Sequence, residues 1–157
     1  MAGAFQLVAL PIEGFKSLLE LSDEELRAHA TRRLVVDEKP GYSCRVSLVD
    51  ADPGERVLLV PFTHHDVDSP YRASGPVFVR EAARTAYPKV NEIPLMLRSR
   101  PLSIRAYDAT AMLVRADVVE GEELEGYIHR IFDDRRLQYL HLHNARPGCY
   151  NCRVERA

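Results

Sequence analysis

The chain has 157 residues, of which 46% are hydrophobic and 28% charged, a balance typical of one globular domain with its own core. Its net charge of −2 argues against a nucleic-acid-binding protein, because a surface that follows phosphates needs a basic excess. No apolar stretch reaches the roughly 18–20 residues of a membrane-spanning helix, so we expect a single soluble domain over residues 1–157 with no membrane partner.

The N-terminal part predicts one strand followed by two helices. The apolar run of residues 1–10 lacks the basic start of a secretory signal, so we interpret it as a strand of a cytoplasmic protein. Apolar residues recur at helical spacing over residues 12–20. Ser22 and Glu25 then form a capping box, which predicts a second helix running to about Ala30.

Most of the remaining chain predicts strands separated by turn residues. The expected strands are residues 32–36, 44–49, 57–62, 77–79, 102–107, 112–119, 137–143 and 150–154. Asp52-Pro53-Gly54 is a turn signal, which predicts that the strands on either side of it form a hairpin.

One amphipathic helix interrupts these strands. Its apolar stripe follows Gly121 and consists of Leu124, Tyr127, Ile128, Ile131 and Phe132. Because the strands outnumber the helices and are mostly joined by short turns, the pattern favours an α+β fold. We expect an antiparallel-rich mixed sheet with two or three helices packed on it, ending in a C-terminal β-hairpin.

Two polar segments do not fit regular structure. Residues 64–76 are rich in turn-forming residues, and residues 88–101 carry arginines between prolines. Long loops inside compact domains are often functional, and arginine binds carboxylates and phosphates with two parallel hydrogen bonds. From these two segments the candidate ligand-binding residues are His65, Tyr71, Arg72 and Arg98.

The C-terminal hairpin is the most site-like feature of the sequence. Arg146-Pro147-Gly148-Cys149 matches a type II turn, in which proline sets the first corner and glycine supplies the positive φ at the second. Asn144 and Arg146 are candidate binding residues in this turn, and Cys149 and His143 are candidate catalytic residues.

The expected register of this hairpin assigns side chains to its two faces. His141 and His143 share one face because side chains alternate along a strand. An even-length turn would place Tyr150 and Cys152 on that same face and Cys149 on the opposite one. A β-bulge would reverse the assignment.

Several chemistries remain open for the hairpin. His141, His143 and Cys152 are suitable zinc ligands, to which the 64–65 histidine pair could add a fourth. Cys149 and Cys152 form a Cys-x-x-Cys pair, although such pairs are reactive at helix N-termini rather than in strands. Either cysteine could act as a nucleophile with a histidine as its base. The remaining interpretation is a purely architectural hairpin.

Blocks of the sequence, in order, resemble one bacterial family. The blocks are Pro40–Leu48, Ser69–Ser74, Phe78–Glu81, Leu97–Arg100 and His143–Tyr150. Together they look like the Domain of Unknown Function 1203 family, and the resemblance covers nearly the whole chain. It implies a small single-domain bacterial protein but brings no activity, cofactor or substrate with it. Cys152 lies outside these blocks, which weakens the redox pair and the metal site that depend on it.

These observations predict a small polar pocket beside the C-terminal hairpin that binds a small polar or anionic metabolite. We assign no metal ion to it, and the cofactor and the question of catalysis stay open. The alternative is a non-catalytic structural or interaction protein, such as a homo-oligomer, with no small-molecule site. That alternative predicts a tightly packed hairpin with no cavity beside it.

Overall fold

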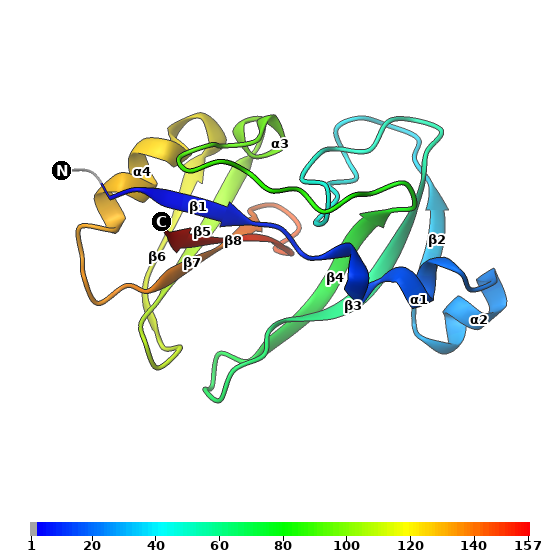
Figure 1. Ribbon diagram of the computed structural model, residues 1–157, viewed down its shortest axis with the longest axis horizontal. Helices are drawn as coiled ribbons and strands as arrows, with labels where there is room; N and C mark the ends of the chain where they lie inside the picture. Colours follow the sequence, from blue (N-terminus) through cyan, green and yellow to red (C-terminus); the bar gives the residue numbers. More distant parts are fainter. Residues whose placement is uncertain (1–2) are drawn as a thin grey trace.

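The computed structural model describes residues 3–157, whose strands form two antiparallel sheets (Figure 1). The larger sheet has the order β1-β8-β7-β5-β6, with β1 Phe5–Val8, β5 Pro101–Tyr107, β6 Leu113–Glu120, β7 Tyr139–Asn144 and β8 Tyr150–Arg156. The smaller sheet has the order β2-β3-β4, with β2 Arg32–Val35, β3 Arg56–His65 and β4 Ala73–Arg80. The α+β class and the C-terminal hairpin are confirmed, while the strands divide into two sheets where the sequence pattern predicted one.

The helices of the described chain are short. They are α1 Lys16–Leu19, α2 Asp23–Ala28, α3 Leu95–Arg98 and α4 Leu124–Ile131, with 3-10 turns at Ile12–Gly14 and Gly121–Glu123. The capping box is present, because the Ser22 hydroxyl accepts from the Glu25 amide and the Glu25 carboxylate accepts from the Ser22 amide. Between residues 3 and 157 no helix combines the length and the apolar character needed to span a membrane.

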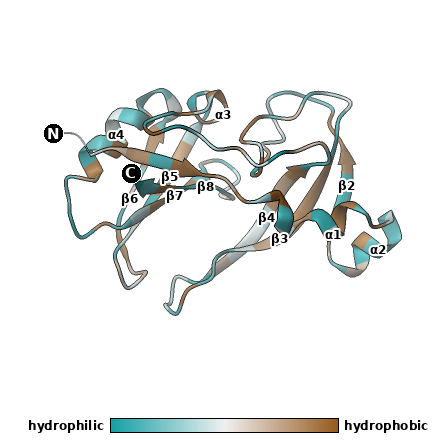
Figure 2. Ribbon diagram, in the orientation of Figure 1, coloured by the Kyte–Doolittle hydropathy of each residue, from teal (hydrophilic) through white to brown (hydrophobic). Residues whose placement is uncertain are grey.

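The main core lies between the larger sheet and α4. The even-numbered side chains of β5 and β7, such as Ile104 and Leu142, pack there against Leu124 and Ile128 of α4. Figure 2 shows hydrophobic residues concentrated on strands such as β1 and β4, with hydrophilic residues prominent on α2. Because side chains alternate along a strand, the odd-numbered residues of β5 and β7 point to the opposite face of the sheet.

Residues 44–49 do not form the predicted strand, and their predicted hairpin with residues 57–62 is wrong. The chain turns tightly there: Leu48 has φ 54°, and its amide donates to the Cys44 carbonyl at 3.0 Å. β3 pairs instead with β2 and β4. Cys44, Val46 and Leu48 are all buried, so their apolar character reflects core packing rather than a strand ladder.

The predicted loop at residues 64–76 is shorter than expected, because strands extend into it from both ends. β3 continues to His65 and β4 begins at Ala73, so only residues 66–72 connect them. The pairing is irregular between Phe62 and His65, as expected at a β-bulge. The long β3–β4 hairpin therefore carries its two histidines to the odd-numbered face of the larger sheet.

A second irregularity sets the register of the C-terminal hairpin. Leu142 pairs with Cys152, whereas His143 pairs with Tyr150, so Asn151 is the extra residue of a bulge. The expected sharing of a face by Tyr150 and His143 is confirmed, but the placement of Cys152 beside the histidines is wrong. The positive φ expected of the turn glycine is present, at 80° for Gly148.

Candidate functional site

The odd-numbered side chains of β5 and β7 form a buried polar surface beneath the β3–β4 hairpin. Tyr107, Tyr139, His141 and His143 are each less than a tenth exposed, with 4%, 8%, 1% and 2% of their surface accessible. Buried polar side chains normally form hydrogen bonds. A ring with partners within the fold is therefore structural, and a ring without them is a candidate for binding a ligand.

His65 is fully occupied by hydrogen bonds within the fold. Its Nδ1 lies 2.8 Å from the Tyr71 carbonyl oxygen, and its Nε2 lies 2.7 Å from the Tyr139 hydroxyl. A carbonyl can only accept, so Nδ1 donates and Nε2 accepts from the tyrosine. His65 therefore ties the 66–72 connection to the larger sheet.

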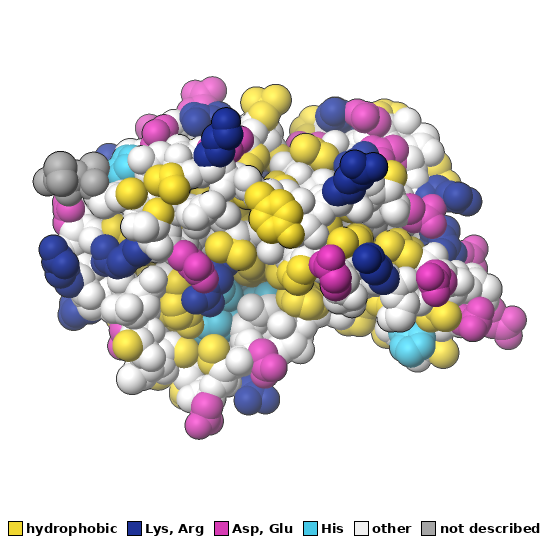
Figure 3. Space-filling model, viewed as in Figure 1, with side chains coloured by type: hydrophobic (Ala, Val, Ile, Leu, Met, Phe, Trp, Pro, Cys, Tyr) yellow, Lys and Arg dark blue, Asp and Glu magenta, His cyan; other side chains and the backbone are white. Residues whose placement is uncertain are grey.

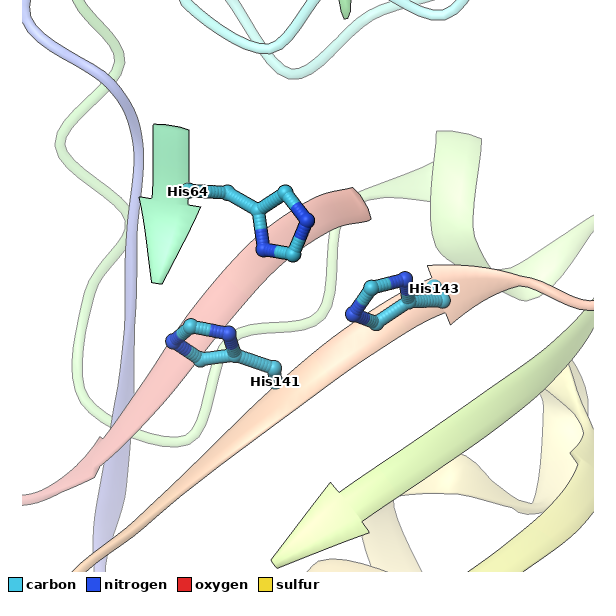
Figure 4. Close-up of side chains that lie close together, drawn as sticks. All are labelled: His64, His141 and His143. Atoms are coloured by element: carbon cyan, nitrogen blue, oxygen red, sulfur yellow. The ribbon is translucent and has the colours of Figure 1, made fainter. Parts of the chain in front are cut away.

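A second group of histidines lacks such partners. Figure 4 shows the rings of His64, from β3, and of His141 and His143, from β7, turned toward a common space. One potential ligand atom from each lies within 4.8 Å of the other two. Among residues 3–157, no hydrogen-bond partner reaches His64 Nδ1, His141 Nδ1 or His143 Nε2, and all three atoms are buried. We call this group the His64 cluster.

The surroundings keep these imidazoles neutral. Burial lowers the pKa of His64 and of His143 to about 4, and lowers the pKa of His141 to about 2. Positive neighbours act in the same direction, and Arg105 lowers the pKa of both His64 and His143. Neutral imidazole is the form that binds a metal ion or accepts a proton.

Backbone geometry also selects a tautomer for His143. Its Nδ1 lies 3.0 Å from the Gly148 carbonyl oxygen and must donate to it. The neutral ring then carries its lone pair on Nε2, the atom directed toward the other two histidines. The C-terminal turn thus determines which atom of His143 is available.

Arg45 is a buried cation without a carboxylate partner. Only 1% of its surface is exposed, and among residues 3–157 it forms no ion pair. Its Nε donates to the Tyr150 carbonyl at 2.7 Å, Nη1 to the Ser43 hydroxyl at 2.7 Å, and Nη2 to the Cys149 sulfur at 3.0 Å. Burial lowers the pKa of Arg45, as expected for a charge surrounded by neutral acceptors.

A cavity of about 460 Å³ is lined by Arg45 and by two of the three histidines of the His64 cluster, and we call it the Arg45 cavity. The polar side chains that line it are Arg45, His64, Ser74, Arg105, His143, Cys149 and Tyr150. Figure 3 shows histidine side chains recessed below the surrounding surface. Arg105 pairs with His141 across β5 and β7 and is half-buried. Like Arg45, it forms no ion pair among residues 3–157.

A second cavity, of about 680 Å³, lies against the other side of the C-terminal turn. Its lining includes Asn144, Arg146 and Arg100, and it shares Cys149 with the Arg45 cavity. Arg100 already pairs with Asp50, and Asn144 accepts a hydrogen bond from the Asn151 side chain at 2.9 Å. The turn is therefore a wall between two cavities.

The residues singled out in the sequence are brought together only in part. His143 and Cys149 line the Arg45 cavity, and Asn144 and Arg146 line the second one. Four others line neither, and one of them is His65, whose two ring nitrogens are engaged by the Tyr71 carbonyl and the Tyr139 hydroxyl. Tyr71 packs edge-on against Tyr107, Arg72 donates to the Val67 carbonyl, and Arg98 donates to the Ile93 carbonyl.

The sequence reasoning missed Arg45 and Arg105 and gave His64 only a secondary place. Arg45 stands between Cys44 and Val46, and a polar residue between apolar ones is typical of a solvent-facing strand position, so no signal in the sequence marks it as buried. Arg105 likewise stands between two apolar residues, Ile104 and Ala106, in another strand. In both cases the flanking apolar residues are buried. Arg45 is itself buried, and Arg105 is half-buried.

One family model matches the chain over residues 41–156, with the description "Protein of unknown function (DUF1203)". The matched range contains all the residues of the Arg45 cavity and the whole His64 cluster. Neither the curated proteins nor the solved structures contain a match.

Proposed function

The chain belongs to the DUF1203 family, whose function is not known, and we propose that it binds a small anionic ligand in the Arg45 cavity. The observation that carries the proposal is the pair Arg45 and Arg105, two guanidinium groups that line one cavity without a carboxylate partner among residues 3–157.

Arg45 is a buried charge without a counter-charge among residues 3–157, and such a charge raises the free energy of the folded protein. A buried cation is normally paired, because removal from water costs several kcal/mol that neutral acceptors offset only in part. An anion in the cavity would supply the missing charge, and guanidinium groups bind carboxylates and phosphates in a bidentate geometry. Arg45 is already held in place by Ser43 and Tyr150, so its side chain loses little conformational freedom when a ligand binds.

The size and lining of the cavity fit a small metabolite. Its volume of about 460 Å³ falls within the range of about 300–1,000 Å³ that is usual for small-molecule sites. Apolar walls come from Leu59, Pro76 and Phe78. His143 and Cys149 line the same space, so a bound ligand would meet an imidazole and a thiol, the two groups through which we expect any reaction to run.

We also infer that the protein works in a reducing compartment such as the cytoplasm. Cys44, Cys149 and Cys152 are all free thiols, and Cys149 is partly exposed beside the ligand cavity. A thiol in that position stays available only where disulfide formation is suppressed.

Titration calorimetry with inorganic phosphate, sulfate and acetate tests the proposal. We expect Arg105→Gln to weaken binding of the preferred anion by about 10- to 100-fold, the loss of one hydrogen bond to a charged group. Arg105 is a better target than Arg45, whose removal would leave two buried carbonyls without donors.

Two control variants remove the same charge outside the cavity. Arg84→Gln changes an exposed arginine, and Arg72→Gln changes the exposed arginine of the 66–72 connection. We expect both to keep the wild-type affinity within about twofold, as is usual for surface charges. Failure of all three anions to bind the wild-type protein, or equal weakening in Arg84→Gln, would overturn the proposal.

A further inference from the structure

The three histidines of the His64 cluster share one unmet requirement. Each has one buried nitrogen that lacks a hydrogen-bond partner within residues 3–157. Leaving a buried polar atom unpaired costs about 1–3 kcal/mol. Three such atoms in one group are a large cost for a structural core, and each unpaired group in a native fold calls for an explanation. Figure 4 supplies one, because the nitrogens are directed at one another rather than scattered.

A divalent transition-metal ion would satisfy all three nitrogens at once. Imidazole nitrogens bind zinc at about 2.0–2.1 Å, which sets them about 3.3 Å apart in a tetrahedral site. The potential ligand atoms already lie within 4.8 Å of one another. The rings therefore need to approach by no more than about 1.5 Å. His64 can move most easily, since it is half-buried and sits in the irregular end of β3.

We propose that His64, His141 and His143 bind one divalent transition-metal ion of the Zn²⁺ type. Three histidines leave one coordination position open, which is the arrangement of zinc sites that act on substrates rather than of closed structural sites. The hydrogen bond from His143 Nδ1 to the Gly148 carbonyl is the outer contact expected behind a metal-binding histidine.

Two other candidate ligands, Cys152 and His65, are excluded. Cys152 lies on the opposite face of the sheet in the apolar core, where burial raises the pKa of its thiol to about 12. Both nitrogens of His65 are engaged in hydrogen bonds. The set that the sequence indicated was His141, His143 and Cys152, with His64 or His65 as a fourth ligand. Three histidines from two sheets therefore replace it.

The open position faces the Arg45 cavity, because His64 and His143 both line it. Arg45 and Arg105 add positive charge to this cavity, so a bare cation would be repelled, whereas a cation bound together with an anion would be stabilised. We therefore assign the fourth position to the anion. This assignment rests on the proposed function, and the three-histidine metal site does not.

Zinc titration of the full chain, without a histidine tag and after treatment with a chelator, tests the site. We expect one Zn²⁺ per chain, and at least about 100-fold weaker binding in His64→Gln and in His143→Gln, each of which removes a ligand. His29→Gln, which changes an exposed histidine outside the site, should bind zinc as the wild type does. The visible absorption of the Co²⁺-loaded protein should indicate four-coordination and be lost in both site variants.

Thermal unfolding of the metal-free variants checks that they are folded, and His64→Gln is the safer of the two because His64 is only half-buried. Zinc binding that is equal in wild type, His64→Gln and His143→Gln would overturn the metal site. Phosphate binding to wild type without any zinc binding would also overturn it, while sustaining the proposed function.

The coupling between metal and anion is measured in the same titrations. We expect saturating phosphate to tighten zinc binding about tenfold in the wild type, with the reciprocal effect of zinc on phosphate, and Arg105→Gln to need about 10- to 100-fold more phosphate for the same effect. Zinc binding that is indifferent to phosphate in the wild type would overturn the assignment of the open position.

Discussion

The two faces of strand β7 are equally buried and chemically opposite. Leu140 and Leu142 point toward α4 and are 0% exposed, in contact with other apolar side chains. His141 and His143 point toward the β3–β4 hairpin and are 1% and 2% exposed, with one unpaired nitrogen each. One face is complete as a packed core, whereas the other has hydrogen-bonding capacity left over.

Packing stability explains the residue types on the apolar face of β7, but it does not explain the histidines on the opposite face. Apolar side chains at the His64 cluster would avoid the cost of unpaired nitrogens, so packing alone does not explain the imidazoles. Side chains that make the folded protein less stable than an apolar substitute would are expected at functional sites, where stability is lost in exchange for activity.

The largest effect is expected on the apolar face. Leu140→Ala should lower the free energy of unfolding by about 2–5 kcal/mol, since it removes buried methyl groups and leaves a cavity in the main core. Urea denaturation measures this change. The folded variant should still bind one zinc ion with wild-type affinity, and loss of zinc binding by the folded protein would mean that the faces are not independent.

The cysteines provide a second contrast between the faces. Cys152 is 1% exposed with its pKa raised to about 12, whereas Cys149 lines both cavities. Iodoacetamide should therefore modify Cys149 at least about 100-fold faster than Cys152 in the native protein, as mass spectrometry of peptides would report. In denaturant the two rates should converge. Equal rates in the native protein would contradict the assignment of Cys152 to the apolar face.

The smallest effect has the most informative sign. In the metal-free protein, His141→Leu should raise the free energy of unfolding by about 1 kcal/mol. The wild-type imidazole has a buried nitrogen without a hydrogen-bond partner among residues 3–157, and the apolar leucine side chain removes that cost. Thermal unfolding after chelator treatment measures it, and Leu142→Met, a volume-conserving change on the opposite face, is the matched control. A large loss of stability in His141→Leu would mean that its ring contacts with Tyr150 and His65 are structural.

Much of the local structure could be predicted from short segments of sequence. The capping box at Ser22, the amphipathic stripe of α4 and the positive φ of Gly148 each depend on residues within a few positions of one another. The sharing of a face by His141 and His143 follows in the same way from the alternation of side chains along a strand.

The candidate site was only half predictable, because its other half depends on register and on contacts between distant segments. The bulge at Asn151 moved Cys152 to the apolar face, and a one-residue shift of this kind reverses every side chain that follows it. The residues 44–49 have the composition of a strand but form a tight turn that directs Arg45 to the Tyr150 carbonyl.

The sequence by itself determined the α+β class, most of the individual elements and the polar character of one face of β7, because these follow from local backbone geometry and side-chain periodicity. Only the tertiary structure decided that His64, and not His65 or Cys152, meets His141 and His143, and that Arg45 and Arg105 line the cavity beside them. The physical reason is that the two sheets meet through contacts between residues far apart in the chain, where irregularities in β3 and β8 set which side chains face each other.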